Sequence, residues 1–303
     1  MTRYQRLLVG MNLTEADRAR SRYAEMSTRM CGAREVHFLH VREEQDLPPD
    51  IQEAYPQIRQ GEKESARQHL QDKACGVFSA PEGVLVSCEV VEGSLLEEII
   101  GHVRDLDIDL VLMGRRSGEQ EQGVLAEKLA RKAPCSVLFL PEDAPEAVSR
   151  ILVAVDFSNH ARAAVEAAVE LAAARGHQEI LCLHVYQVPL GYSHTGKSLV
   201  EFEEILRQNA EEQYREMIAK IDARGIDLRF LLACGDQPSR VIRDQIFNHH
   251  VDLAVVGARG RTTGAAILLG SVTERLIRIT PCPLLAVKQK GEGMGILEAL
   301  FKV

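Results

Sequence analysis

Residues 251–273 read VDLAVVGARGRTTGAAILLGSVT, and they are the most informative stretch of the chain. Its apolar run, 253–256, leads directly into the pattern G-x2-G-x9-G-S at residues 257–271, and a helix-like run begins at Val272. Glycines at these places let the backbone turn with positive φ and let a ligand come close to the main chain. Free amides and the dipole at a helix N-terminus favour an anion. The stretch therefore predicts a strand, a phosphate-binding loop and a helix.

Length, composition and charge limit the classes of protein to which this chain can belong. It has 303 residues, enough for two domains, with the globular balance of 46% hydrophobic and 26% charged residues. The net charge of −8 argues against DNA or RNA as a partner. No apolar run is long enough to span a bilayer, and residues 1–10 show no signal-peptide pattern. Seven Cys without a CxxC pair indicate a reducing compartment, so we expect a cytoplasmic protein.

The chain repeats itself after about 145 residues. RLLVGMNLT at residues 6–14 aligns with RILVAVDFS at 150–158, and DLVLMG at 109–114 aligns with DLAVVG at 252–257. Because one repeat is about one domain long, we interpret the chain as a tandem duplication.

We expect two domains and a short tail. The first domain covers residues 1–141, the second covers 150–290, and the tail covers 291–303. The segment between the two domains contains prolines with acidic and small residues, which is typical of a linker.

Each half alternates short β-branched runs with amphipathic helical stretches. Ser158 is a candidate N-cap for the first helix of the second half. A longer helix is expected over about residues 199–224, and another after Pro238. Strands that alternate with helices predict an α/β fold, a parallel sheet with helices on both faces and ligands at the carboxyl ends of the strands. The strands expected in the second half are 151–156, 179–186, 228–233, 253–257 and 284–288.

The motif at 257–271, with its preceding strand and following helix, resembles the signature of universal stress protein domains of the ATP-binding kind. The first half resembles the same family more weakly, and the two halves cover the chain up to about residue 288. The resemblance implies two tandem Rossmann-like domains of the adenine-nucleotide α-hydrolase-like fold. Each would be a five-stranded parallel sheet in the order 3-2-1-4-5 with helices on both faces. It also implies a stress-response regulator that binds ATP, with or without Mg²⁺, at one site in the second domain.

The resemblance assigns roles to residues of the second half. Asp156, flanked by Val155 and Phe157 at the end of the first strand, would hold the adenine edge. Val185, after the second strand, would also hold the adenine, and Gly257 would border the ribose. Main-chain amides can cradle phosphates, and arginines add charge-assisted hydrogen bonds. The residues implied around the phosphates are Arg259, Gly260, Arg261, Gly270, Ser271, Val272 and Thr273.

Two segments have alternative interpretations. SVTE at 271–274 also fits a capping box, which would only start a helix. GYSHTGKS at 191–198 fits the P-loop pattern GxxxxGK[ST], although Pro189 interrupts the path from the preceding strand. The same segment is also explained as a polar loop whose Ser198 caps the next helix, or as a loop whose Lys197 closes over the nucleotide.

The first half departs from the nucleotide-binding pattern. Asn12 stands where Asp156 stands in the second half. The loop after Gly114 is shorter and lacks the second glycine and both hydroxyls of the motif. Glu119 and Glu121 add negative charge where phosphates would lie. We therefore expect no tightly bound ATP in the first domain.

Four smaller features are expected to be structural. His40 and His184 end corresponding strands, and we expect buried, hydrogen-bonded rings rather than catalytic bases because no nucleophile is paired with them. Cys135 and Cys282 follow prolines and are expected to be small core residues. No catalytic or metal-binding residue is assigned from the sequence.

Two other classes of function stay open. One is an enzyme that uses ATP, as a slow ATPase or for phosphoryl or nucleotidyl transfer. The other is a scaffold or a binding protein that takes a small apolar ligand through its first domain. The sequence shows no metal-holding carboxylate beyond Asp156 and no water-activating base, so weak ATPase activity is the most we expect.

The expected partners are an adenine nucleotide and a regulatory protein. Single-domain members of the family commonly pair through their last strands, so the resemblance implies that 136–140 and 284–287 are pairing edges. A homodimer of tandem chains is the expected assembly, and the apolar tail at 291–303 is a candidate contact.

Overall fold

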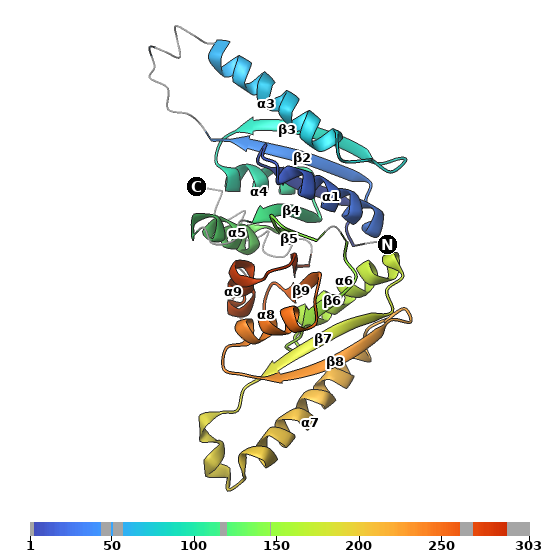
Figure 1. The fold of residues 1–303 in the computed structure, drawn as a ribbon, viewed down its shortest axis with the longest axis vertical. Coiled ribbons are helices and arrows are strands. Elements are labelled where there is room, and N and C mark those ends of the chain that lie inside the picture. The colour runs from blue at the N-terminus through green and yellow to red at the C-terminus, as the bar shows by residue number, and fades with distance from the viewer. Residues whose placement is uncertain are drawn as a thin grey trace. The chain divides into compact units, whose positions relative to one another are not determined.

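The structure is a computed structural model that describes residues 3–43, 50, 57–115, 120–145, 147–260 and 269–289. Arg261, Glu119, the side chain of Glu121 and the tail at 291–303 lie outside the described residues. The chain divides into two compact units, which are Met1–Glu146 and Ala147–Val303 (Figure 1).

The first unit is built on a parallel sheet with strands in the order β3-β2-β1-β4-β5. Its strands, among the described residues, are β1 (Arg6–Met11), β2 (Glu35–Arg42), β3 (Leu85–Glu92), β4 (Leu110–Arg115) and β5 (Ser136–Pro141). The helices between them are α1 (Asp17–Cys31), α3 (Gln57–Cys75), α4 (Leu95–Asp105) and α5 (Gln120–Lys132).

The second unit repeats this arrangement with strands in the order β8-β7-β6-β9-β10, and its pairs are also parallel. The strands in its described part are β6 (Ile151–Ala154), β7 (Glu179–Tyr186), β8 (Asp227–Cys234), β9 (Leu253–Gly257) and β10 (Leu284–Val287). The helical segments are α6 (Asn159–Arg175), the 3₁₀ segment η1 (Leu190–Thr195), α7 (Leu199–Ile218), α8 (Pro238–Asn248) and α9 (Ser271–Ile279).

The strand order confirms the predicted 3-2-1-4-5 topology in both units. The chain first moves outward from the central strand and then crosses to its other side. Right-handed crossovers in opposite directions place helices on both faces of the sheet. The same reversal opens a crevice at the carboxyl ends of β6 and β9, where ligands of such folds bind.

Burial explains the composition of the strands. Every residue of β5 and of β10 is buried, as expected for strands covered on both faces, which read as continuous apolar runs. The residues of the edge strands β3 and β8 are mostly exposed or half-buried, and these strands carry more polar residues. Ser158 is the N-cap of the Ala-rich helix α6, and its side chain accepts a hydrogen bond from the Ala161 amide at 3.1 Å. The predicted N-cap is therefore confirmed.

Two of the predicted element ends differ from the structure by two or more residues. The first strand of the second unit ends at Ala154 rather than at Asp156. Helix α7 ends at Ile218 rather than near Arg224. Beyond it, the side chain of Asp222 accepts the Arg224 amide at 3.0 Å, and Arg224 has a positive φ of 50°. Such a local aspartate turn competes with further helix.

Thiols in the sheets behave as core residues. Cys135 and Cys282 are buried, as predicted. Burial also raises the pKa of the Cys182 thiol to about 11, although the Tyr214 hydroxyl opposes this shift. Of the helices described, none has both the length and the apolar composition that a membrane span requires.

Candidate functional site

A cavity of about 610 Å³ opens at the carboxyl ends of the strands in the second unit. Its walls come from the ends of β6, β7 and β9, from α8 and from the first turn of α9. This volume lies within the range of about 300–1,000 Å³ that is usual for small-molecule sites. The predicted residues that line it are Val155, Asp156, Val185, Gly257, Arg259, Gly260, Gly270, Ser271, Val272 and Thr273.

Two glycines allow the elements around this cavity to approach one another. A Cβ atom on Gly257 would lie 2.8 Å from the carbonyl carbon of His160, so β9 lies against the start of α6. A Cβ atom on Gly260 would lie 3.0 Å from Oδ2 of Asp156. Among the described residues, neither glycine has a positive φ. The expected left-handed turns are therefore not found here, and the glycines serve close approach instead.

The first turn of α9 presents backbone donors to the cavity. Gly270 is the N-cap, and its carbonyl accepts the first helical hydrogen bond, from the amide of Glu274 at 2.9 Å. The amides of Ser271, Val272 and Thr273 precede that bond, so they are the orphan donors of the helix. No side-chain cap forms, and the interpretation of residues 271–274 as a capping box is wrong. This helix end can bind an anion.

The side chain of Thr273 anchors α9 to the strand beside it. Its hydroxyl donates to the Gly257 carbonyl at 2.8 Å, and the Gly270 amide donates to the Ala258 carbonyl at 2.8 Å. The helix start and the end of β9 are therefore held together by polar contacts. Arg259, which follows β9, lines the cavity as well and contributes positive charge.

Asp156 is held by an unusual turn after β6. Its Oδ1 accepts the Ser158 amide at 3.1 Å, and the intervening Phe157 has a left-handed φ of 63°. The ring of Phe157 lies 4.4 Å from the ring of His184 between centroids. A left-handed non-glycine residue costs about 1 kcal/mol, and the ring contact offsets part of this cost. Phe157 does not line the cavity but supports the turn that presents Asp156.

His184 also lines the cavity, which the sequence did not reveal. Its Nδ1 donates to the Val155 carbonyl at 2.8 Å, which confirms the expected hydrogen bond, but the ring is half-buried and lines the cavity. Because Nδ1 must carry the proton to donate, Nε2 is the acceptor in the neutral ring. The available signal was its position directly before Val185 at a strand end.

The segment 191–198 has no P-loop geometry. β7 ends at Tyr186, and the segment begins within the 3₁₀ turn η1 rather than at the end of a strand. Ser198 forms a capping box with Glu201, which confirms the interpretation of a loop that caps α7. Hydrogen bonds from Ser198 lower the pKa of the Glu201 carboxyl. Lys197 is exposed and does not line the cavity.

The corresponding space in the first unit is occupied by a buried ion pair. Asp17 and Arg20 are 0% and 4% exposed, and Arg20 Nη1 pairs with Asp17 Oδ1. Arg20 also donates to the Gly10 carbonyl at 3.5 Å, and its guanidinium occupies the space that a Cβ atom on Gly114 would need. Ala161, the repeat counterpart of Asp17, lines the cavity of the second unit.

This ion pair was missed in the sequence. The counterparts of Asp17 and Arg20 in the second half are Ala161 and Ala164, on the buried face of the matching helix. Comparing the halves along that helix, and not only along the glycine motif, would have shown two charged residues in place of two alanines. A charge on a buried helix face needs a partner.

The first unit has a surface depression beside β2 and α3. Its volume is about 660 Å³, and its lining includes His40, Arg42, Glu62 and His69. Arg42 pairs with Glu62, and the Nδ1 atom of His40 is hydrogen-bonded to the Met11 carbonyl at 2.8 Å. The lining thus combines an ion pair and histidines with the apolar side chains of Leu13 and Ala66, and the hypothesis of an apolar ligand in this domain stays open.

Comparisons with known proteins agree on one family. The sequence model of the universal stress protein family matches residues 3–141 and again residues 147–288. A universal stress protein of Thermus aquaticus is 31% identical over 139 residues, which cover 46% of this chain and 97% of that protein. One from Synechocystis is 29% identical over 150 residues, with coverage of 46% and 97%.

A solved structure shows the same fold over both units. The universal stress protein from Archaeoglobus fulgidus matches with a TM-score of 0.66 at 21% identity and covers 94% of this chain and 96% of its own. Because the family model matches both halves of the sequence, the chain belongs to the universal stress protein family and carries two of its domains in tandem.

Proposed function

We propose that the second unit binds ATP at one site per chain and acts as a regulatory switch with slow or no hydrolysis. The observation that carries the proposal is the cavity of about 610 Å³ in which Asp156, the glycines after β9 and the free amides of α9 meet. The sequence resemblance to ATP-binding members of the family supports the same ligand.

The cavity offers each part of the nucleotide suitable chemistry. The phosphates would lie at the amides of residues 271–273, where the helix dipole also favours negative charge. The ribose would lie beside Gly257, which lines the cavity. The adenine would lie between the end of β6 and Val185, with Asp156 at its polar edge.

Mg²⁺ enters this proposal only as an ion carried by the phosphates. Among the described residues, no group of three or more His, Cys, Asp or Glu side chains is placed to hold a metal ion. ATP-dependent binding of a regulatory protein and a homodimer of tandem chains stay predictions. The competing hypothesis of an ATP-using enzyme predicts turnover of labelled ATP, whereas the switch predicts that bound ATP is recovered intact.

Substitution of Ser271 by proline tests the part of the site where the phosphates would lie. Ser271 is the first residue of α9, where proline is favoured and only removes an N–H that the helix does not use. Ser271→Pro should therefore keep the helix but weaken ATP binding about tenfold or more, because one charge-assisted hydrogen bond is lost. Isothermal titration calorimetry measures the affinity and the number of ATP molecules per chain.

Ser271→Ala is the matched control, since it removes the hydroxyl and keeps the amide. We expect it to bind ATP more tightly than Ser271→Pro, and circular dichroism should show equal helix content in both variants. Asp156→Ala tests the other end of the cavity and should also weaken binding about tenfold. Equal affinity in all four proteins, wild type included, or two ATP per wild-type chain, would refute the single-site proposal.

A further inference from the structure

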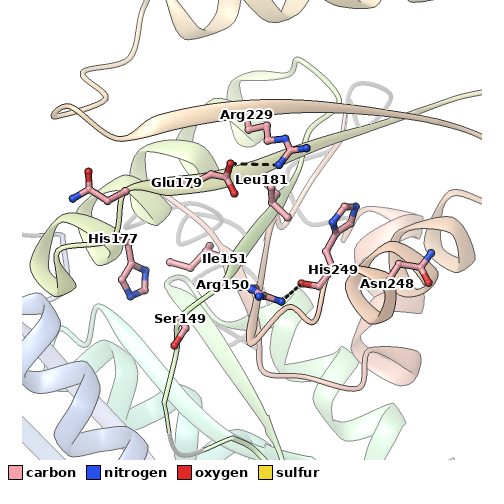
Figure 2. A pocket seen from close by; sticks show the side chains of 10 residues that line it. Ser149, Arg150, Ile151, His177, Glu179, Leu181, Arg229, Asn248 and His249 are labelled. Carbon is pink, nitrogen blue, oxygen red and sulfur yellow. Dashed lines mark hydrogen bonds and ion pairs between the residues drawn. The ribbon is translucent and has the colours of Figure 1, made fainter.

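A second cavity of the second unit lies at the amino ends of the strands, at the opposite edge of the sheet from the first. Its volume is about 510 Å³. Figure 2 shows the side chains that surround it, which come from the starts of β6, β7 and β8, the turn after α6 and the end of α8. Its charged and titratable side chains are Arg150, His177, Glu179, Arg229 and His249.

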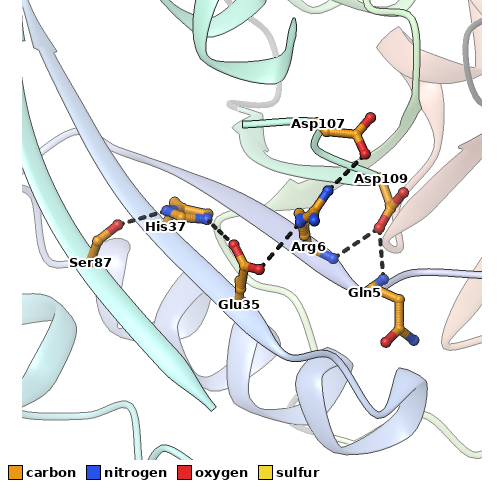
Figure 3. Close-up of polar contacts among 7 residues, drawn as sticks. All are labelled: Gln5, Arg6, Glu35, His37, Ser87, Asp107 and Asp109. Atoms are coloured by element: carbon orange, nitrogen blue, oxygen red, sulfur yellow. Dashed lines mark hydrogen bonds and ion pairs between the residues drawn. The ribbon is translucent and has the colours of Figure 1, made fainter. Parts of the chain in front are cut away.

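The same edge of the first unit is a closed polar network (Figure 3). Arg6 donates from Nε to Glu35 Oε1 at 3.3 Å and from Nη1 to Asp107 Oδ2 at 2.7 Å. Contact with the Glu35 carboxylate raises the pKa of the Arg6 guanidinium. Glu35 also faces His37, whose Nδ1 is bonded to Ser87 Oγ at 2.7 Å. In this unit, therefore, two carboxylates neutralise the arginine.

Backbone contacts establish which residues correspond. Oδ2 of Asp109 accepts the amides of Gln5 and Arg6 at 2.8 and 2.9 Å. Oδ2 of Asp252 accepts the amides of Ser149 and Arg150 at 2.8 and 2.9 Å in the same way. Arg150 is therefore the counterpart of Arg6, on a backbone with the same hydrogen bonds.

The carboxylate that pairs with Arg6 through Nη1 has no counterpart in the second unit. Asp107 has a left-handed φ of 52°, two residues after the end of α4. His250 has a φ of 51°, two residues after the end of α8, and is thus the matching residue. A histidine consequently stands where the first unit supplies an acid.

Other exchanges make this edge of the second unit more basic. Where β2 pairs with β3 in the first unit, Ser87 lies opposite His37. At the corresponding place in the second unit, where β7 pairs with β8, Arg229 lies opposite Leu181, so an arginine replaces a serine. The C-caps of the corresponding helices are Leu106 in the first unit and His249 in the second. Two arginines and two histidines thus surround a single lining carboxylate, Glu179.

The arginines of this cavity retain donors for a ligand. Within the described residues, the Arg150 guanidinium makes one hydrogen bond, from Nη1 to the His249 carbonyl at 3.2 Å, and no ion pair. Arg229 faces Glu179 at 3.6 Å, and both side chains are about half exposed. A guanidinium carries five N–H donors, so most donors of Arg150 are not used within the protein.

We propose that this cavity binds the phosphate group of a small phosphorylated metabolite, with Arg150 and Arg229 as its main contacts. The planar fork of arginine matches the oxygens of a phosphate, and two arginines suit its double negative charge better than that of a carboxylate. Imidazole N–H groups of His177 and His249 can add donors. The volume is that of a small-molecule site. This site is separate from the nucleotide cavity and does not depend on it.

Amide chemical shifts of the full chain, recorded during titration with inorganic phosphate, test the proposal site by site. We expect saturable shifts at Ser149, Arg150 and His177. Shifts at Gly260 and Ser271 would report the nucleotide cavity separately, with its own affinity. Shifts near Arg150 that grow linearly without saturation, up to tens of millimolar phosphate, would overturn the proposal.

Two variants of the second unit should weaken phosphate binding. Arg150→Gln removes the guanidinium, and a loss of about tenfold or more is expected. His250→Asp supplies the acid that Asp107 supplies to Arg6, and aspartate tolerates a left-handed backbone. That carboxylate should occupy Arg150 and weaken binding about fivefold or more.

Arg240→Gln is the matched control, because Arg240 is an exposed arginine near the other end of α8. It should bind phosphate as the wild type does, and unchanged melting temperatures should show that all three variants fold. The proposal fails if Arg150→Gln and His250→Asp both retain wild-type affinity at the shifted amides.

Discussion

The loop after the first strand is built alike in the two units, but the helix that follows it begins differently. Leu13 and Phe157 both have a left-handed backbone, with φ of 60° and 63°. His40 and His184 each hydrogen-bond through Nδ1, at 2.8 Å, to a carbonyl at or directly after the end of that strand, those of Met11 and Val155. The duplicated frame has therefore been kept around both positions.

The two units differ at the start of the helix after the first strand. In the second unit this helix start borders the cavity, which we call the open edge, and in the first unit it carries the buried ion pair, which we call the filled edge. In the second unit, α6 begins at Asn159 behind a side-chain cap, Ser158. In the first unit, α1 begins at Asp17, and no side chain caps it. The carboxylate of Asp17 instead accepts the amides of Asn12 and Thr14, at 3.1 and 3.2 Å. A buried carboxylate needs a cation, and Arg20 supplies it from the next turn.

In the first unit, side chains of the helix after the first strand occupy the ends of the central strands. The altered glycine motif alone would only weaken phosphate contacts in the first unit. The Asp17–Arg20 pair does more, because its guanidinium lies against Gly10 and Gly114, at the ends of the two central strands. The two units thus share a fold but differ in what occupies the ends of their two central strands.

Breaking the buried pair should have the largest effect. Arg20→Ala leaves the Asp17 carboxylate buried without its cation and should lower the stability of the first unit by about 3–5 kcal/mol. Hydrogen exchange measured by mass spectrometry on peptides from residues 3–43 detects this loss without interference from the second unit. The double variant Asp17→Ala/Arg20→Ala should lose less, because it leaves no unpaired charge and restores the alanines of the second unit.

Arg18→Ala is the control on the same helix. Arg18 is 66% exposed and forms a surface pair with Glu15 at 3.5 Å, so its loss should change stability by less than about 1 kcal/mol. If Arg20→Ala exchanges no faster than Arg18→Ala, the ion pair is not the element that stabilises the filled edge.

Placing the carboxylate of the first unit in the cavity of the second unit should have the next largest effect. Ala161 is 2% exposed and lines the cavity at the position of Asp17. Ala161→Asp places a carboxylate near Asp156 and near the proposed phosphates, and ATP affinity should fall about tenfold or more in calorimetry. Ala161→Asn has the same shape without the charge, so a smaller loss is expected. Equal losses in the two variants would show that bulk, and not charge, closes the edge.

Much of the fold could be predicted because its signals are local. Alternating β-branched runs and helical alanine spacing predicted the strands at 179–186 and 253–257 within the bounds that the structure shows. The strand order came from the family resemblance and is confirmed in both units. The end of α7 was misplaced, because the turn at Asp222 depends on one side-chain hydrogen bond that periodicity does not register.

The candidate site was predicted less completely. Glycine spacing predicted residues that line the cavity, but it could not show that close approach to His160 and Asp156, rather than positive φ, requires those glycines. Such contacts join residues about a hundred positions apart, and a local pattern carries no information on them. The Asp17–Arg20 pair was missed for a related reason, because its meaning depends on which helix face covers the sheet.

The smallest effect is expected at Lys197. This residue of the second unit lies outside the cavity and is a candidate contact to the nucleotide. Its side chain is exposed, and the Gly196 before it has a positive φ of 72°. A flexible lysine that reaches the phosphates through solvent adds a screened attraction, so Lys197→Ala should weaken ATP binding about two- to fivefold at low salt. High salt should remove the difference, and Lys220→Ala, at another exposed lysine, should show none. Equal affinity of Lys197→Ala and wild type at low salt would exclude Lys197 from the site, which would then consist of the cavity alone.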